Sequence, residues 1–161
     1  MEREPDISIR EANSADAGQI SGLLRSLSHT FTTHADGRGA EAFFATLTES
    51  AISVVLARSD IVYWVAEPKL GKVVAAAGLR DNQRIAHLFV DARYQGFGLG
   101  RRLWELMRDH ALRAGNPGMF TVNSSVVAVP VYERFGFVVA GARVEKDGGR
   151  YVPMKLDLRA Q

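Results

Sequence analysis

The chain has 161 residues, of which 47% are hydrophobic and 24% charged, and it carries a formal net charge of +2. These values are ordinary for a globular protein, and the length suits a single domain over residues 1–161 with a core of its own. Because the chain has no cysteine, disulfides, thiol nucleophiles and thiolate metal sites are excluded.

Charge and hydropathy also limit the kinds of partner that the chain is expected to bind. The small net charge and the scattered basic residues argue against nucleic acid as a partner. No apolar run reaches about 18 residues, and the first six residues are charged rather than apolar, so neither a membrane span nor a signal peptide is expected. A cytoplasmic location follows as the expectation. The four histidines are too widely spaced to suggest a metal site.

The first third of the sequence predicts one strand and two helices. Residues 7–10 alternate as in a strand. Asn13 or Ser14 can cap a helix whose apolar residues recur at three- and four-residue steps. Residues 28–39 are polar and contain glycine, which indicates a loop. A second helical pattern, with a break, covers residues 43–57.

Three β-rich segments follow, and turn residues separate them. Val, Ile, Tyr and Trp fill 61–66, and apolar residues also dominate 73–79 and 84–90. Pro and Gly within 68–71 and the Asp-Asn pair at 81–82 are typical of turns. The sequence therefore predicts three consecutive strands joined by hairpins.

The third of these strands ends in a glycine-rich loop that opens a helix. Glycine occupies three alternate positions, Gly96, Gly98 and Gly100, and a helical pattern follows up to Gly115. The free N–H groups of a first helical turn attract anions, as does the helix dipole, and glycine lets a phosphate approach the backbone. Strand, loop and helix together predict a phosphate-binding site rather than an ordinary turn.

The spacing of the loop separates the classes of phosphate ligand. A mononucleotide P-loop needs Lys and then Ser or Thr after its last glycine, where this chain has Arg101 and Arg102. The dinucleotide fingerprint needs G-x-G-x-x-G, whereas these glycines read G-x-G-x-G. Sites for ATP, GTP and NAD are therefore poorly matched. Arg93, Arg101 and Arg102 suit a phosphate-rich ligand, although a solvated helix start would carry the same residues.

The last informative segment is 119–137, MFTVNSSVVAVPVYERFGF. It predicts a strand over 120–123 and then a helix that Ser124 or Ser125 caps and Gly136 ends. Two last strands are expected over 138–139 and 151–156, around a turn at 146–149.

Two parts of this pattern resemble the GNAT superfamily of N-acetyltransferases. Gln95-x-x-Gly98-x-Gly100 is similar to the pyrophosphate loop of that family, and residues 131–137 are similar to the segment that carries its tyrosine. The predicted element order, β-α-α-β-β-β-α-β-α-β-β, also occurs there. The resemblance implies an α/β fold with a mixed α+β sheet, the GNAT-like acyl-CoA N-acyltransferase fold.

The resemblance also implies acetyl-CoA as a co-substrate. In the family, two neighbouring strands splay apart and the pantetheine arm lies along the exposed edge, here between 84–90 and 119–123. A backbone N–H near Leu88 to Val90 would then face the thioester oxygen. The residues expected to bind the cofactor are Leu88, Phe89, Val90, Gln95, Gly96, Phe97, Gly98, Leu99, Gly100, Arg101, Asn123 and Tyr132.

Two residues are expected to be catalytic, Tyr132 and His87. The resemblance implies that Tyr132 gives a hydrogen bond or a proton to the CoA sulfur, although a helix aromatic packed in the core would look the same. His87 lies on the cofactor strand and has a suitable intrinsic pKa for a general base. It could equally be a partly exposed strand residue, in which case a water chain, Glu67 or Asp81 would take the amine proton.

The expected reaction transfers an acetyl group from acetyl-CoA directly to a primary amine of a small molecule, an amino acid or a peptide. In the family, the segment that corresponds to residues 28–39 shapes the acceptor site. It holds one carboxylate here, which disfavours a strongly cationic polyamine. A non-catalytic regulatory module that binds acyl-CoA is the alternative.

Assembly is the last expectation. Many GNAT domains pair, and the large apolar residues Phe43, Phe44, Tyr63 and Trp64 exceed what one small core obviously needs. A homodimer would cover them, whereas burial of all four within one chain is the alternative.

Overall fold

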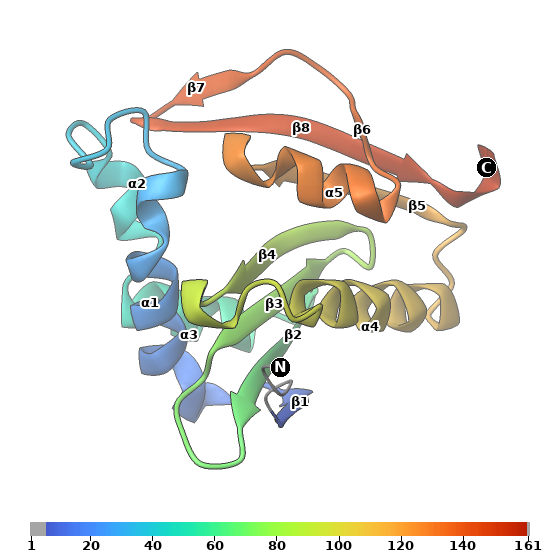
Figure 1. Ribbon diagram of the computed structural model, residues 1–161, viewed down its shortest axis with the longest axis horizontal. Helices are drawn as coiled ribbons and strands as arrows, with labels where there is room; N and C mark the ends of the chain where they lie inside the picture. Colours follow the sequence, from blue (N-terminus) through green and yellow to red (C-terminus); the bar gives the residue numbers. More distant parts are fainter. Residues whose placement is uncertain (1–5, 161) are drawn as a thin grey trace.

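The computed structural model describes residues 6–160 as an eight-stranded sheet with helices on its faces (Figure 1). The signal-peptide prediction concerned the N-terminal segment, and residues 1–5 lie outside the described part. The strands are β1 (Ile7–Glu11), β2 (Ile61–Pro68), β3 (Ala75–Arg80), β4 (Arg84–Val90), β5 (Met119–Ser124), β6 (Val138–Val139), β7 (Val144–Lys146) and β8 (Gly149–Asp157). The helices are α1 (Ala17–Ser26), α2 (Glu41–Ala45), α3 (Glu49–Ala57), α4 (Leu99–Arg113) and α5 (Val129–Phe135).

The sheet is mixed, as the sequence predicts. Its strand order is β1-β2-β3-β4-β5-β8-β6, and β7 pairs with β8 at one end. Neighbouring strands are antiparallel except β4 and β5, which are parallel. The hairpins in the middle of the chain and the crossover through α4 account for this arrangement.

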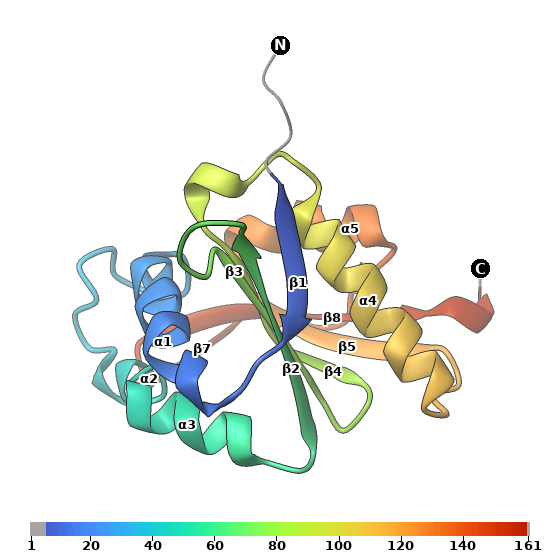
Figure 2. The same cartoon turned by 90° about the horizontal axis from the view of Figure 1, so that it is seen from below.

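Two apolar clusters lie on opposite faces of the sheet. Figure 2 shows α1, α2 and α3 on one side of β2 and β3 and α4 on the other. The α4 face buries Leu103, Trp104 and Met107, which recur at helical spacing. The opposite face buries Ile20 of α1 and Ile52 of α3 against β2 and β3. Helices pack on both faces of the sheet, and this packing holds the carboxyl end of β4 in place.

One strand differs from the sequence prediction, whereas the predicted break in the second helical pattern is confirmed. The second helical pattern is two helices, because Thr48 accepts a hydrogen bond from the N–H of Ala51 and starts α3 anew. Strand β7 was not predicted, because Val144–Lys146 is short and mostly polar. It forms through pairing with β8 across a tight turn, where Asp147 and Gly148 both have positive φ.

No helix within residues 6–160 is both long enough and apolar enough to cross a membrane.

Candidate functional site

The strands β4 and β5 separate soon after they meet. They pair only at Arg84 with Thr121 and at Ile85 with Val122, so from residue 86 to the end of β4 no strand covers the edge that faces β5. A four-bond clamp holds the closed end: the side chain of Asn116 bonds to the backbone of residues 82, 118 and 119 at 2.6–2.9 Å. Strands β4 and β5 therefore form a V-shaped opening, called the V below, that widens toward the glycine loop.

The open edge of β4 presents backbone N–H groups. The N–H of Asp91 donates to the carbonyl of Val74 beside β3, so alternate peptide groups of β4 face β3 and those between them face the V. The N–H groups of Leu88 and Val90 therefore point into the V. The Val90 carbonyl also points away from β3, because it accepts a hydrogen bond from the Gln95 side-chain amide at 2.9 Å.

The glycine loop ends the V at the amino terminus of α4. Gly98 is the N-cap residue of this helix with φ of 79°, and no side chain caps the helix. Gly96 also has a positive φ, and a Cβ added at either glycine would meet no atom within 4 Å. The space beside the loop is therefore open to a ligand that the first N–H groups of α4 can reach.

A pocket of about 500 Å³ joins the V to the glycine loop. Nine of the predicted cofactor-binding residues line it along with Tyr132, namely Leu88, Phe89, Val90, Gln95, Gly96, Gly98, Leu99, Gly100 and Arg101. Segments far apart in the sequence thus meet at one cavity, and its volume is that of a site for a small molecule.

Helix α5 places Tyr132 on the wall of this pocket. Ser125 caps the turn that leads into the helix, and Gly136 ends it with φ of 104°. The Tyr132 side chain is only 5% exposed, and its ring packs edge-on against Phe135 and Phe137. Burial raises the pKa of its hydroxyl above the ordinary value, so the phenol is a proton or hydrogen-bond donor at neutral pH.

The basic residues at the loop divide among different partners. Arg101 and Arg134 line the pocket, and the Arg101 guanidinium lies 5.2 Å from the centre of the Phe135 ring. Arg93 instead pairs with Asp91 at 3.2 Å, and Arg102 donates to the carbonyl of Ile7. Positive charge at the pocket therefore comes from Arg101 and from Arg134, which the sequence analysis did not select.

Three predicted site residues do not line the pocket. Phe97 is half-buried in the glycine loop, and Asn123 is exposed on β5 opposite Pro153. His87 lies on the other face of β4 from Leu88, where its Nδ1 is 2.8 Å from the hydroxyl of Tyr63. Burial lowers the pKa of His87 to about 4, and the ring is neutral at pH 7.

The weaker general-base candidates also lie elsewhere. Glu67 forms an ion pair with Arg10 at 2.9 Å, and Asp81 lies in the β3–β4 turn beside Arg80 at 3.6 Å. Within residues 6–160, no three His, Asp or Glu side chains gather closely enough to hold a metal ion.

The start of the chain supplies a further wall, at Leu27 and in the segment 28–39 that the resemblance assigned to the acceptor site. Leu27, Thr30 and Phe31 line the pocket opposite α5. The Phe31 ring lies 5.4 Å from that of Phe89, between centroids, and 6.0 Å from that of Phe43. The polar composition of residues 28–39 concealed this contact, and the apolar spacing of positions 27 and 31 was its one signal.

Known protein families and curated sequences show what the chain is similar to. Residues 31–158 match the family model described as acetyltransferase (GNAT) domain. No curated protein sequence matches the chain.

Solved structures share the fold at low identity. A GCN5-related N-acetyltransferase from Rhodopseudomonas palustris is 21% identical with a TM-score of 0.76, over 98% of this chain and 99% of the other. The PaiA N-acetyltransferase from Thermoplasma acidophilum, solved with coenzyme A, is 17% identical with a TM-score of 0.74, over 94% and 99%. The ribosomal-protein-S18-alanine N-acetyltransferase from Escherichia coli is 20% identical with a TM-score of 0.63, over 93% and 92%.

Proposed function

The chain belongs to the GNAT acetyltransferase family, and from that premise we propose that its acceptor is the primary amine of a small molecule, an amino acid or a peptide. As a member it is an acyltransferase with acetyl-CoA as its co-substrate. The observation that supports acetyl transfer is the open edge of β4 together with the uncapped amino terminus of α4. An extended thioester with a pyrophosphate at its far end fits that combination of edge and anion site.

The proposed reaction forms one bond and breaks one. The amine nitrogen attacks the acetyl carbon, the C–S bond breaks, and the acetylated amine and free CoA thiol leave, with a proton moved from the nitrogen to the sulfur. The N–H groups of Leu88 and Val90 would stabilise negative charge on the acetyl oxygen, and they need no reorganisation because β4 is fixed by β3.

Tyr132 is proposed to protonate the departing sulfur or to donate a hydrogen bond to it. The residue lines the pocket, and Phe135 and Phe137 hold its ring. Because burial raises the pKa of Tyr132 above the ordinary phenol value, which already exceeds that of a thiol, a hydrogen bond to the sulfur costs less than complete transfer of the proton.

For the amine proton we propose His87, acting through water. An alkyl ammonium with a pKa of about 10.4 must lose a proton before it attacks. The ring of His87 is neutral at pH 7, since burial lowers its pKa to about 4, and the same shift makes it a weaker base than an ordinary histidine. It contacts Phe89 edge-on at 5.7 Å, and Phe89 lines the pocket. A base with so low a pKa holds the proton only transiently.

The experiment that tests this function is thiol release. Purified protein with acetyl-CoA should release CoA thiol when a panel of alkylamines, amino acids, short peptides and spermidine is supplied, and mass spectrometry should find the acetylated amine. Thiol release without any acetylated product would be hydrolysis. Tight acetyl-CoA binding with no release on any amine would instead support a non-catalytic binding module.

A further inference from the structure

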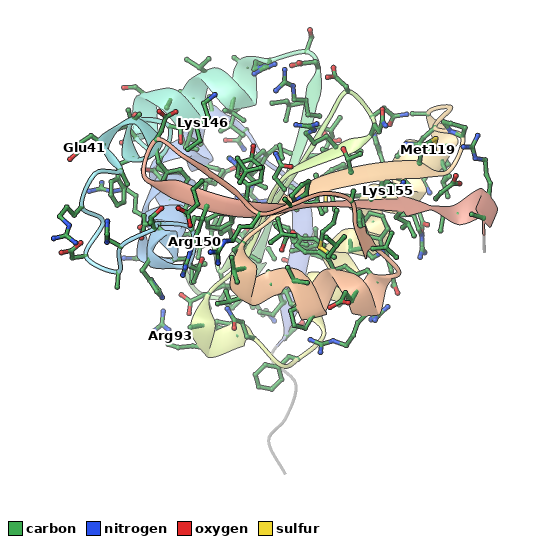
Figure 3. All side chains as sticks on the ribbon, turned by 90° about the horizontal axis from the view of Figure 1, so that it is seen from above. Glu41, Arg93, Met119, Lys146, Arg150 and Lys155 are labelled. Atoms are coloured by element: carbon green, nitrogen blue, oxygen red, sulfur yellow. The ribbon has the colours of Figure 1, made fainter. Side chains whose placement is uncertain are left out.

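Arg150 lies next to the pocket wall that Phe31 forms. Its N–H donates to the carbonyl of Phe31 at 2.7 Å, and Phe31 lines the pocket. It also lies two residues before Val152, which pairs with Ser124 at the end of β5, and β8 contacts the turn before α5. In Figure 3, Arg150 lies between the loop after α1 and the beginning of α5.

The side chain of Arg150 lies on the face of β8 that is turned toward Tyr132, although the residue is not itself part of the pocket wall. Side chains alternate along a strand, so Arg150 shares a face of β8 with Val152. Val152 packs against the apolar cluster that contains Leu88 and Tyr132. The side chain of Arg150 therefore lies on the face of β8 that packs against the cluster containing Tyr132.

Arg150 has no partner for its charge within residues 6–160. Its Nε atom is buried from solvent without a hydrogen bond, and the side chain forms no ion pair. Glu145 lies directly opposite on β7, but its carboxylate is 3.6 Å from Arg143, and both of those side chains are about half exposed. An unpaired buried N–H is costly, and a ligand that accepts from it would remove that cost.

The surface next to Arg150 is apolar. Phe31 and Phe89 stand 5.4 Å apart between ring centres, and Leu27 completes this part of the wall. Such a surface binds an aliphatic or aromatic group by burial of area. The positive charge of the guanidinium disfavours a polyamine at this position.

We propose that Arg150 determines the acceptor by binding its carboxylate, so that the substrate is an amino acid with an apolar side chain, which lies against Phe31 and Phe89. The inference rests on the proposed function, since it specifies the amine of the same reaction. A guanidinium binds a carboxylate through paired, charge-assisted hydrogen bonds, which fix the orientation of the bound molecule. The amino group on the neighbouring carbon is then held in one direction.

Matched acceptors test this inference. Leucine and phenylalanine are compared with leucinamide and phenylalaninamide, which keep the shape but lose the charge. For the wild type we expect kcat/KM for each acid to exceed that for its amide about tenfold or more. Arg150→Met should bring the acid-to-amide ratio down about tenfold or more, and Arg150→Lys should restore part of it. Comparing ratios between enzymes cancels the different basicity of the amines.

Arg113→Met is the control, because Arg113 is an exposed basic residue at the end of α4 that does not line the pocket. It should leave the ratio unchanged. A wild type without preference for the acids, or an Arg150→Met variant with an unaltered ratio, would overturn the inference. So would a variant whose only change is a higher KM for acetyl-CoA. Failure of every amine to release thiol would contradict the proposed function itself, whereas equal use of acids and amides contradicts only the role of Arg150.

Discussion

At the scale of single residues, Tyr132 combines burial with a place on the pocket wall. Its ring is held by Phe135 and Phe137, so removal of the oxygen should leave the packing intact. We expect Tyr132→Phe to lower kcat about a hundredfold, the usual range for loss of a general acid, with little change in acetyl-CoA affinity. Steady-state kinetics and calorimetry with acetyl-CoA separate the two effects.

Tyr151→Phe serves as the control, because Tyr151 is a partly buried tyrosine of β8 that does not line the pocket. Its kcat should match the wild type. Equal losses of kcat and of affinity in Tyr132→Phe would assign that tyrosine to binding instead.

His87 makes the stability of the protein depend on pH. Its folded pKa, lowered to about 4 by burial, lies below the unfolded value of about 6.5. As the pH falls, the unfolded chain therefore takes up the proton first, and stability is present above pH 6.5 and lost toward pH 4. We expect the free energy of unfolding to be about 1–2 kcal/mol smaller at pH 5 than at pH 7.

Urea unfolding at the two pH values measures this difference. His87→Asn should remove most of it, although the substitution also disturbs the bond to Tyr63 and lowers stability at both pH values. An equal pH dependence in the variant would assign the effect to other groups.

At the scale of elements, the junction of the glycine loop with α4 needs a backbone conformation that favours glycine, and it lies on the pocket wall. Gly98 has a φ of 79°, and a Cβ there would project into open space beside the helix terminus. We expect Gly98→Val to cost about 1–3 kcal/mol of stability and to abolish acetyl-CoA binding, because the side chain occupies the path to the N–H groups. Calorimetry on the folded variant measures the binding.

The other end of the same helix supplies the matched control. Gly115 has a φ of 99° and equally open surroundings, but it does not line the pocket. Gly115→Val should therefore lose similar stability and keep its affinity. Unchanged affinity in Gly98→Val would remove the loop from the binding site.

At the scale of the whole molecule, the aromatic residues that suggested a dimer are largely accounted for within one chain. Tyr63 and Trp64 are each 5% exposed, and Phe43 and Phe44 pack partly buried near Phe31. These four residues therefore no longer argue for a partner. Exposed apolar side chains do remain on the edge strand β6 at Val138 and Val139, and edge strands pair readily.

A homodimer remains our prediction, now through the β6 edge. Light scattering at micromolar concentration should give about twice the chain mass of 17.6 kDa, and Val139→Lys should return it to one chain because a charge blocks edge pairing. A wild-type mass near 17.6 kDa would reject the dimer.

Most of the fold could be predicted because its signals are local. Hydrophobic periodicity marks strands and helices within a few residues, and caps such as Gly136 act on their own neighbours. The short strand β7 escaped prediction because its pairing with β8, rather than its composition, makes it a strand. The break between α2 and α3 depends on one hydroxyl, that of Thr48.

The sequence by itself determined the glycine loop between β4 and α4, the order of the elements except β7, and a tyrosine on a helix after a strand. Each of these depends on residues close in the chain. Only the tertiary structure decided which residues share the pocket. It placed His87 behind β4 with Tyr63, brought Phe31 and Arg134 to the pocket wall, and left Arg150 beside it without a partner. The physical reason is that burial and pairing depend on what packs from distant segments, and no local pattern contains that information.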